Sequence, residues 1–296
     1  MLISFFNKNN IEYSQNVSLK EISSFKIGGI AKLICYPKTA LEVSKIIKFC
    51  NKSNIDFYSF GKCSNVLFSD DGIEKLIIKT DNLNSIKKID DGFEFGSGVM
   101  LARASKTAVD NGFCGMEFSY GIPGSVGGAV YMNAGAYGGE MKNIVASVEY
   151  VDDKGNILKI DAARLDFSYR HSFFSDKNYV ITSTTVKLNK GDVDKSLELI
   201  NEYQTARKTK QPLEYPSAGS VFKRPEGFFA GKLIQDSDLK GYTIGGAQVS
   251  VKHSGFIINV GDATAKDVLS LIDYIKNTVY NNFGVTLECE LKYFKD

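Results

Sequence analysis

Residues 121–140 read GIPGSVGGAVYMNAGAYGGE, and this stretch decides how the rest of the chain is interpreted. It contains seven glycines and three alanines, and its only charged side chain is Glu140. A segment without an acid, a base or a nucleophile in its interior cannot perform chemistry by itself. Glycine runs of this density either fill tight turns and close backbone packing or let successive N–H groups approach a phosphate. The segment alone leaves both interpretations open.

A second loop favours the phosphate interpretation. The Walker pattern is absent, and GSGVML at 96–101 lacks the third glycine of a Rossmann fingerprint. GKCSNVLF at 61–68, however, follows an expected strand and offers Ser64 and Asn65 at a sharp turn. Two separate loops rich in hydrogen-bond donors suit a diphosphate gripped from both sides. The residues therefore predict a nucleotide or dinucleotide site that is not of the Rossmann kind.

Composition limits the class of protein and of partner. The 296 residues are 43% hydrophobic and 24% charged, which is typical of a soluble globular protein of two domains or one large domain with an appendage. With 36 Lys and Arg against 34 Asp and Glu and no basic block, nucleic acid is not expected as a partner. No run reaches the length of a membrane span, and the N-terminus lacks a secretory signal, so we expect neither membrane insertion nor export. Five scattered cysteines and two histidines predict free thiols in the cytoplasm and no metal site.

Hydrophobic periodicity predicts an α+β chain with mixed sheets. We expect helices at 39–51, 101–110, 192–209, 228–235 and 265–282. We expect strands or hairpins at 31–36, 56–60, 74–79, 85–96, around the DDKG turn at 152–155, and at 180–188, 244–251, 254–260 and 285–293. QPLEYPS at 211–217 holds two of the five prolines and predicts a domain boundary.

Taken together, seven motifs resemble the UDP-N-acetylenolpyruvoylglucosamine reductase (MurB) family, and the resemblance runs nearly from end to end. Only 49 residues separate Arg170 from Ser220, which is similar to the shorter subfamily. The motifs are SFKIGGIA (24–31), GKCSNVLFSD (61–70), GIPGSVGGAVYMNAGAYG (121–138), YRHSFF (169–174), PSAGSVFKRP (216–225), LKGYTIGGAQVSVKHSGFIIN (239–259) and LECEL (287–291).

The resemblance implies a two-part FAD-binding domain of the vanillyl-alcohol-oxidase (PCMH) type, followed by a C-terminal α+β substrate-binding domain. The implied boundaries are 1–80 and 81–210 for the two FAD-binding subdomains and 211–296 for the substrate domain. FAD would be bound non-covalently, and Cys63 stands where the family usually has glycine. The implied FAD-binding residues are Gly61, Cys63, Ser64, Asn65, Gly121, Ile122, Gly124, Ser125, Gly127, Gly128, Asn133 and Gly135.

The family's reaction reduces UDP-N-acetylglucosamine enolpyruvate to UDP-N-acetylmuramate in peptidoglycan precursor synthesis, which serves cell-wall biogenesis, cell shape and cell division. NADPH reduces FAD, and hydride passes from flavin N5 to the β-carbon of the enol ether. The developing charge at the α-carbon and its carboxylate needs a proton donor and a cation. The resemblance implies that Ser220 protonates the α-carbon and that Arg170 grips the carboxylate.

A glutamate completes the implied catalytic set. Alternation places Glu288 and Glu290 on one face of an expected strand, so periodicity does not choose between them. The family pattern favours Glu290. Candidates for binding the substrate are Tyr137, Arg207, Lys210, Lys223 and Arg224, although solvated surface charge is an equal alternative for Arg207 and Lys210.

Two rival classes are weighed against the reductase. A flavin oxidase of the same cofactor fold often binds FAD covalently through a histidine, but the only histidine before residue 211 is His171, outside the cofactor loops. A nucleotide-binding regulatory module would keep the glycine loops without needing Arg170, Ser220 and Glu290. We therefore expect a cytoplasmic, monomeric, NADP-dependent FAD oxidoreductase acting on a small molecule.

Overall fold

The computed structural model describes residues 1–296, which divide into two compact units. Unit 1 comprises Met1–Gln15, Leu33–Lys62 and Lys75–Ala206, and unit 2 comprises Asn16–Lys32, Cys63–Glu74 and Arg207–Asp296. Two short segments from the first quarter of the chain thus fold with the C-terminal residues. The three-domain division at residues 80 and 210 stays a prediction.

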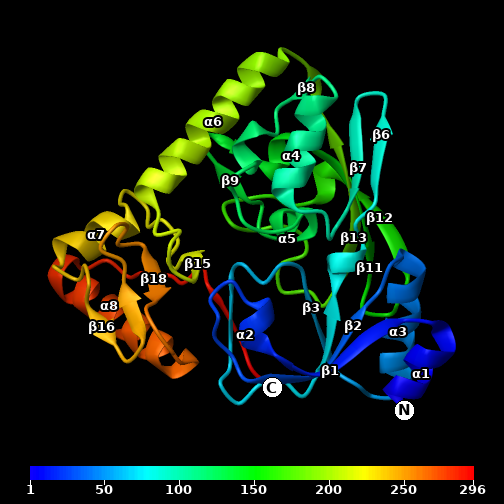
Figure 1. Ribbon diagram of the computed structural model, residues 1–296, viewed down its shortest axis with the longest axis horizontal. Helices are drawn as coiled ribbons and strands as arrows, with labels where there is room; N and C mark the ends of the chain where they lie inside the picture. Colours follow the sequence, from blue (N-terminus) through cyan, green and yellow to red (C-terminus); the bar gives the residue numbers. More distant parts are fainter. The chain divides into compact units, whose positions relative to one another are not determined.

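The first sheet has the strand order β1-β2-β5-β3 and contains a βαβ arrangement, in which α3 connects β2 to β3. β5 pairs in parallel with β2 and with β3. Figure 1 shows α1 (Leu2–Asn9) and α3 (Ala40–Lys52) beside this sheet. Thr39 begins α3 by accepting a hydrogen bond from the Glu42 N–H, and the apolar face of the helix is buried. The strands are β1 (Glu12–Ser18), β2 (Ile30–Tyr36), β3 (Phe57–Phe60) and β5 (Leu76–Lys79).

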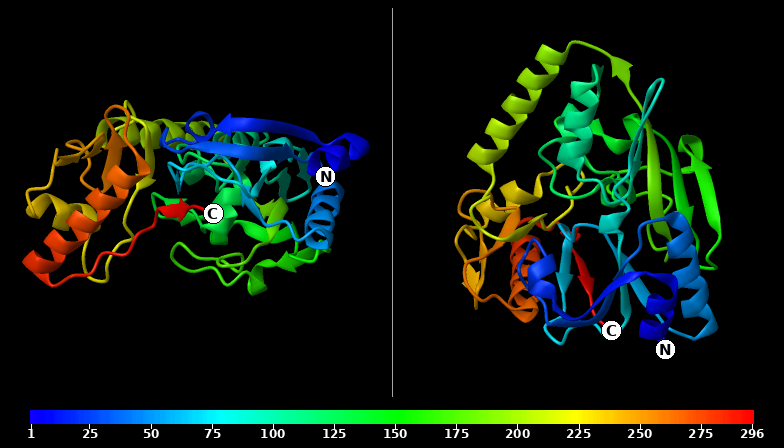
Figure 2. Two further views of the ribbon diagram at one scale, coloured as in Figure 1. Left: turned by 90° about the horizontal axis from the view of Figure 1, so that it is seen from below. Right: turned by 45° about the vertical axis from the view of Figure 1, so that its right-hand side comes forward.

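A five-stranded antiparallel sheet of order β12-β11-β13-β7-β6 forms the rest of the unit 1 framework (Figure 2). Both predicted hairpins are present, β6–β7 and β11–β12. The helix predicted at 101–110 is confirmed as α4 (Leu101–Asp110), and α5 (Val126–Tyr131) is a short helix inside the glycine segment. The strands are β6 (Ile86–Ile89), β7 (Gly92–Gly96), β11 (Val145–Val151), β12 (Ile157–Asp161) and β13 (Val180–Lys187).

Smaller elements complete unit 1 and lead out of it. Two two-stranded ladders pair β8 with β14 and β9 with β10. α6 (Val193–Lys210) runs from unit 1 into unit 2 and buries only Ser196 and Ile200. The short strands are β8 (Phe113–Cys114), β9 (Gly135–Ala136), β10 (Gly139–Glu140) and β14 (Asn189–Lys190), and the 3-10 helices are η1 (Thr80–Asn82), η2 (Glu117–Ser119), η3 (Met141–Asn143) and η4 (Ala162–Arg164).

Unit 2 is built on one core and a four-stranded antiparallel sheet of order β15-β18-β17-β16, whose strands are yellow to orange in Figure 1. Phe25, Ile27 and Leu67 lie in that core, which explains why their segments belong here. A parallel pair joins β4 to β19. The elements are α2 (Leu19–Ile22), β4 (Val66–Phe68), β15 (Ser217–Ser220), α7 (Ala230–Asp236), β16 (Thr243–Ile244), β17 (Ala247–Val249), β18 (Phe256–Asn259), α8 (Ala265–Phe283) and β19 (Lys292–Phe294).

Two predicted strands differ from the structure. The strand predicted at 244–251 is a hairpin, β16–β17, because Gly245 takes a φ of 54° and reverses the chain. The strand predicted at 285–293 forms a ladder only from Lys292 to Phe294, with one isolated bridge between Cys289 and Phe222. Alternating side chains in 287–291 therefore reflect an extended segment rather than a long strand.

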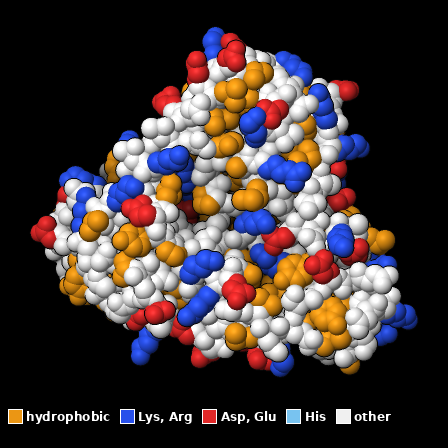
Figure 3. Space-filling view, viewed as in Figure 1, with side chains coloured by type: hydrophobic (Ala, Val, Ile, Leu, Met, Phe, Trp, Pro, Cys, Tyr) orange, Lys and Arg blue, Asp and Glu red, His pale blue; other side chains and the backbone are white.

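The surface carries mixed charge. On the face drawn in Figure 3, basic and acidic side chains are interspersed, and the chain as a whole has a net charge of only +2. None of the helices combines the length and the apolar character needed to cross a membrane.

Candidate active site

The glycine segment is packed against β7 and the turn after it. The N–H groups of Val126 and Gly127 donate to the carbonyls of Val99 (2.8 Å) and Ser97 (2.9 Å). A Cβ at Gly127 would lie 2.6 Å from that of Ser97, so no larger residue fits there. Close packing, the structural use considered for this segment, is therefore present.

The same segment also holds donors that the protein does not use. The N–H groups of Gly121, Gly124, Ser125 and Gly128 have no acceptor within the chain. The hydroxyls of Ser125 and Ser97 are buried and unpaired. Buried polar atoms without partners are unusual in folded proteins and call for a specific explanation. A bound anionic group that accepts several hydrogen bonds supplies one.

The end of β3 approaches this donor group. A Cβ at Gly61 would lie 2.5 Å from Oγ of Ser125, so the two segments are in direct contact only because residue 61 is glycine. The buried Lys79 ammonium donates to the carbonyl of Gly61 and lies 3.0 Å from Asp81, which also pairs with Lys62. Burial raises the pKa of the Asp81 carboxyl, but the two lysines outweigh burial and leave that pKa below its ordinary value. Two positively charged side chains thus lie near Gly61: Lys79 at its carbonyl and Lys62 next to it in the chain.

These observations test whether a dinucleotide diphosphate fits. The site has unpaired N–H groups and unpaired buried hydroxyls that could donate to a diphosphate. Its glycines lie where a Cβ atom would collide with a neighbouring segment, so the backbone stays open to a ligand. Lys62, in the loop after β3, and Lys79, at the end of β5, add positive charge that matches a diphosphate. The residues of unit 1 therefore fit the cofactor that the sequence implied. Reasoning from sequence missed Lys79 and Ser97, and the only signal was a lysine ending the apolar run LIIK at 76–79.

Of the other predicted cofactor residues, Cys63, Ser64 and Asn65 lie in unit 2, whereas Ile122, Asn133 and Gly135 lie in unit 1. Cys63 is buried and has a φ of 51°, so it does occupy the left-handed region that favours glycine. Asn65 donates from Nδ2 to the carbonyl of Glu290 at 3.2 Å, and its own carbonyl accepts from Lys292. The loop that carries Ser64 is thus fastened to the C-terminal segment.

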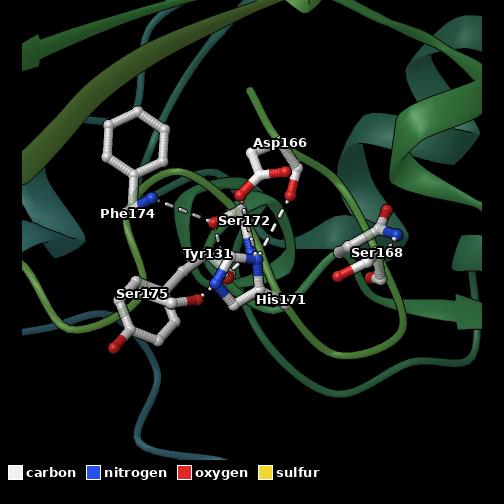
Figure 4. Close-up of polar contacts among 8 residues, drawn as sticks. Tyr131, Asp166, Ser168, His171, Ser172, Phe174 and Ser175 are labelled. Atoms are coloured by element: carbon white, nitrogen blue, oxygen red, sulfur yellow. Dashed lines mark hydrogen bonds and ion pairs between the residues drawn. The ribbon is translucent and has the colours of Figure 1, made fainter. Parts of the chain in front are cut away.

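Arg170 stands at the tip of a tight turn in unit 1. Ser168 and His171 exchange two backbone hydrogen bonds of 3.2 Å each, leaving Tyr169 and Arg170 as the two turn residues. Arg170 has a φ of 57°, and its guanidinium carbon lies 5.0 Å from the ring centre of Tyr169. Figure 4 shows the base of this turn, with Asp166 beside the His171 ring.

Ser220 and the two candidate glutamates come together in unit 2. The Glu290 N–H donates to the carbonyl of Val221 (2.8 Å), and the Lys223 N–H donates to that of Glu288 (2.9 Å). Glu288 pairs with Lys223 at 2.5 Å and has a side chain that is 71% exposed, whereas Glu290 is half-buried. Glu288 thus forms a surface ion pair, and Glu290 is the better candidate for the catalytic glutamate.

His253 lies close to Ser220 and is neutral in this arrangement. Its Nδ1 accepts a hydrogen bond from the Gly255 N–H at 3.1 Å. A Cβ built on Gly255 would be 3.1 Å from Cε1 of His253 and 3.4 Å from Oγ of Ser220. Burial lowers the pKa of His253 below its ordinary value of 6.5. The histidine therefore serves as packing and a hydrogen-bond acceptor beside the serine.

The predicted substrate-binding residues are dispersed. Tyr137 stacks on Tyr203 with ring centres 4.1 Å apart and donates its hydroxyl to the Tyr203 carbonyl at 3.0 Å. The Arg224 guanidinium lies 4.0 Å from the ring centre of Phe229. Arg207 and Lys210 occupy the last turn of α6.

Backbone strain marks several of these positions. Leaving aside Asn and Asp, which tolerate it, four non-glycine residues have a positive φ: Lys26, Cys63, Tyr137 and Arg170. Three of the four are residues that the sequence singled out for a cofactor, a substrate or catalysis. Strained conformations of this kind collect at functional sites because the surrounding structure must hold them in place.

Comparison with known proteins gives consistent matches over the whole chain. The family model for the C-terminal domain of UDP-N-acetylenolpyruvoylglucosamine reductase matches residues 211–294, and an FAD binding domain model matches 31–161. The UDP-N-acetylenolpyruvoylglucosamine reductase of Caldicellulosiruptor saccharolyticus is 46% identical over 97% of this chain and 93% of its own length. That of Lachnoclostridium phytofermentans is 47% identical over 94% and 91%. The crystal structure of MurB from Thermus caldophilus superposes with a TM-score of 0.82 at 32% identity, covering 96% of this chain and 99% of the other.

Proposed function

Because the chain belongs to the UDP-N-acetylenolpyruvoylglucosamine reductase family, we propose that it reduces UDP-N-acetylglucosamine enolpyruvate to UDP-N-acetylmuramate with NADPH as the electron donor. FAD is the cofactor, held non-covalently. The observation that carries the proposal is identity of 46% with a reductase of that name across 97% of this chain. Peptidoglycan precursor synthesis is the corresponding process, and we propose a cytoplasmic monomer.

The donors around the glycine segment would hold FAD. Unused backbone N–H groups would donate to FAD from Gly121, Gly124, Ser125 and Gly128. The unpaired hydroxyls of Ser97 and Ser125 would add two further donors. The second predicted loop adds Cys63, Ser64 and Asn65. When bound, FAD supplies the hydride chemistry, accepting from NADPH and delivering from N5 to the β-carbon of the enol ether.

Arg170 would bind the enolpyruvyl carboxylate. Hydride addition at the β-carbon leaves negative charge at the α-carbon, and this charge spreads into the carboxylate. A guanidinium stays protonated at every relevant pH and presents a planar fork that matches a carboxylate. The turn holds the backbone of Arg170 in a left-handed conformation, which would limit how far the guanidinium must move as the charge develops.

Ser220 would give the proton to the α-carbon. A serine hydroxyl is a weak acid, so the transfer depends on proximity to a strongly basic carbon. Glu290, half-buried on the segment that bonds to Val221, would lie beside the substrate carboxylate and help to polarise it. For the substrate diphosphate we propose Tyr137, Arg207, Lys210, Lys223 and Arg224 as contacts.

Absorption spectroscopy of the purified protein tests the proposal. We expect flavin bands in visible light that bleach when NADPH is added without oxygen. Adding UDP-N-acetylglucosamine enolpyruvate should then restore the colour rapidly, and other UDP-sugars should not. A colourless protein that gains no flavin on incubation with FAD would contradict the proposal.

Replacing the proposed proton donor separates the two halves of the reaction. Ser220→Ala should bleach with NADPH at the normal rate, whereas product formation should fall about 100- to 10,000-fold, the usual range for loss of a general acid. Ser217→Ala, on the same strand β15, is the matched control and should keep full turnover. Unchanged turnover in Ser220→Ala would remove this serine from its role.

A further inference from the structure

Asn133 is the most completely enclosed polar residue of the glycine segment. It is 0% exposed, and its φ of 41° is in the left-handed region that asparagine tolerates. Its Nδ2 donates to Oε2 of Glu140 (2.7 Å) and to the carbonyl of Ser168 (3.0 Å), while its Oδ1 accepts from the Lys142 N–H (2.9 Å). A primary amide has two donor hydrogens, and both are used within the protein.

The bond to Ser168 reaches the turn that carries Arg170. Ser168 is the first residue of that turn, and its N–H and carbonyl both bond to His171. The Asn133 amide therefore adds a third bond at the entry to the turn, across 35 residues of sequence. The glycine segment and the arginine turn are joined at this point.

Ser172 fastens the other side of the turn. It is 0% exposed, its Oγ donates to the carbonyl of Tyr131 at 2.8 Å, and the same oxygen accepts from the Phe174 N–H at 3.3 Å. Figure 4 shows Ser172 among Tyr131, Phe174 and Ser175. Both anchors thus run from the arginine turn to the stretch 131–133.

The left-handed backbone of Arg170 needs contacts such as these two anchors to hold it in place. A left-handed backbone is unfavourable for an ordinary residue, and it persists only where neighbouring contacts determine it. Two side-chain hydrogen bonds from fully buried residues, one on each side of the turn, supply such contacts. Without them the turn would relax, and the guanidinium would move with it.

We propose that Asn133 and Ser172 are positioning residues that hold Arg170 in the geometry needed to bind the substrate carboxylate. Asn133 then has this role in place of the cofactor contact predicted from the sequence, because its amide donors are already bonded within the protein. The inference rests on the proposed role of Arg170 in the reductase reaction.

A pair of substitutions isolates the bond from Asn133 to Ser168. In Asn133→Asp combined with Glu140→Gln, the new carboxylate accepts from the new amide and still accepts from the Lys142 N–H. It cannot donate to the Ser168 carbonyl, so that bond is lost, and the Lys142–Glu140 ion pair is lost equally in Glu140→Gln alone. Glu140→Gln alone is the matched control, because Asn133 keeps all its partners.

The expected result is a selective loss in the step that uses the enolpyruvyl substrate. Because misplacing a binding group by about 1 Å can cost about 100-fold, we expect kcat/KM for this substrate to fall about 10- to 100-fold, largely through a higher KM. FAD content and the rate of bleaching by NADPH should stay at the level of the control. Ser172→Ala, which cuts the other anchor, should shift KM in the same direction.

Two controls distinguish positioning from general stability. Ser44→Ala removes a buried hydroxyl that donates to the Gly155 carbonyl elsewhere in unit 1, and it should lower the melting temperature without changing KM. Should the double substitution fail to fold, Ser172→Ala carries the test alone. A normal KM in Ser172→Ala and in every folded Asn133 variant would overturn the inference.

A double-mutant cycle with Arg170→Lys shows whether the anchors act through the arginine. In that background the anchor substitutions should change kcat/KM by less than about twofold, since residues acting as one unit are not additive. If the combined variant loses kcat/KM by the product of the two single fold-losses, the inference is overturned, while the role of Arg170 stays intact. A normal kcat/KM in Arg170→Lys alone would instead contradict the proposed role of that arginine. Loss of FAD with normal turnover of the remaining flavoprotein would restore the cofactor role of Asn133.

Discussion

Cys63 combines two properties that rarely occur together. Its side chain is buried, which favours a small apolar group, and its φ of 51° favours glycine. The family resemblance identified glycine as the usual residue here, and the backbone explains why. Individual residues of the proposed site are thus held in place against their own conformational preference.

Substitutions at Cys63 should reverse the usual order of alanine and glycine. Alanine keeps the left-handed strain, whereas glycine removes it, so Cys63→Gly should be more stable than Cys63→Ala by about 1 kcal/mol. Urea unfolding of the two variants measures the difference. At Cys50, which is buried in α3, the same pair should show the ordinary order, with alanine the more stable. A higher free energy of unfolding for Cys63→Ala than for Cys63→Gly would show that the backbone strain is absent.

His253 should make stability fall as the pH is lowered through about 6.5. Its folded pKa lies below 6.5 because of burial, and a proton on Nδ1 would break the bond from the Gly255 N–H. The unfolded chain therefore binds more protons than the folded protein below about pH 6.5, and stability falls as the pH is lowered. Urea midpoints should drop less for His253→Gln than for the unaltered protein. His171→Gln is the control, and an equal drop in His253→Gln would contradict the prediction.

At the scale of elements, the N-terminus of α8 is capped both by residues next to it in the chain and by a residue far away in the sequence. Thr264 and Asp267 form a capping box, which the sequence pattern contains in full. Asp70, nearly 200 residues earlier, adds bonds to the N–H groups of Ala265 (2.9 Å) and Lys266 (3.2 Å). The segment after the second cofactor loop is thereby fixed to the longest helix of unit 2.

Removing the distant cap should loosen the first turn of α8. Asp70→Ala loses two hydrogen bonds and a favourable charge at the helix N-terminus, with an expected cost of about 1–2 kcal/mol. Hydrogen exchange of the Ala265 and Lys266 amides should accelerate accordingly. Asp71→Ala is the neighbouring control, because the hydrogen bonds of Asp71 go to Ser69 and to neither of these amides. Unchanged exchange in Asp70→Ala would mean that Thr264 and Asp267 suffice.

At the scale of the whole molecule, cofactor binding should set the stability. A ligand that binds only the folded protein stabilises it by about 2.7 kcal/mol at 100 times its Kd. Stripping FAD should therefore lower the melting temperature, and adding FAD back should restore it in proportion to the logarithm of its concentration. Calorimetry with and without FAD measures this, with free riboflavin, which lacks the diphosphate, as the matched control. Equal melting temperatures with and without FAD would contradict the diphosphate site described around Ser125.

Local patterns predicted much of the architecture. α4 has its predicted bounds, α8 ends within one residue of its prediction, and the hairpins at the DDG and DDKG turns are present. α5 was not predicted, because two adjacent glycines disfavour a helix, whereas the tertiary bonds from Val126 and Gly127 to Val99 and Ser97 help to stabilise it. The membership of residues 16–32 and 63–74 in unit 2 depends on a core shared with residues more than 150 positions later, which no local pattern contains.

The sequence by itself determined the motifs, their order and the family to which they belong, since spacing and residue type survive in the linear chain. Only the tertiary structure decided which polar groups are occupied and which are available. It committed the Asn133 amide to Glu140 and Ser168, gave Glu288 an ion pair with Lys223, and left the N–H groups of Gly121 and Gly128 unpaired. The physical reason is that a hydrogen bond depends on distance and direction in space, and folding sets both between residues far apart in the chain.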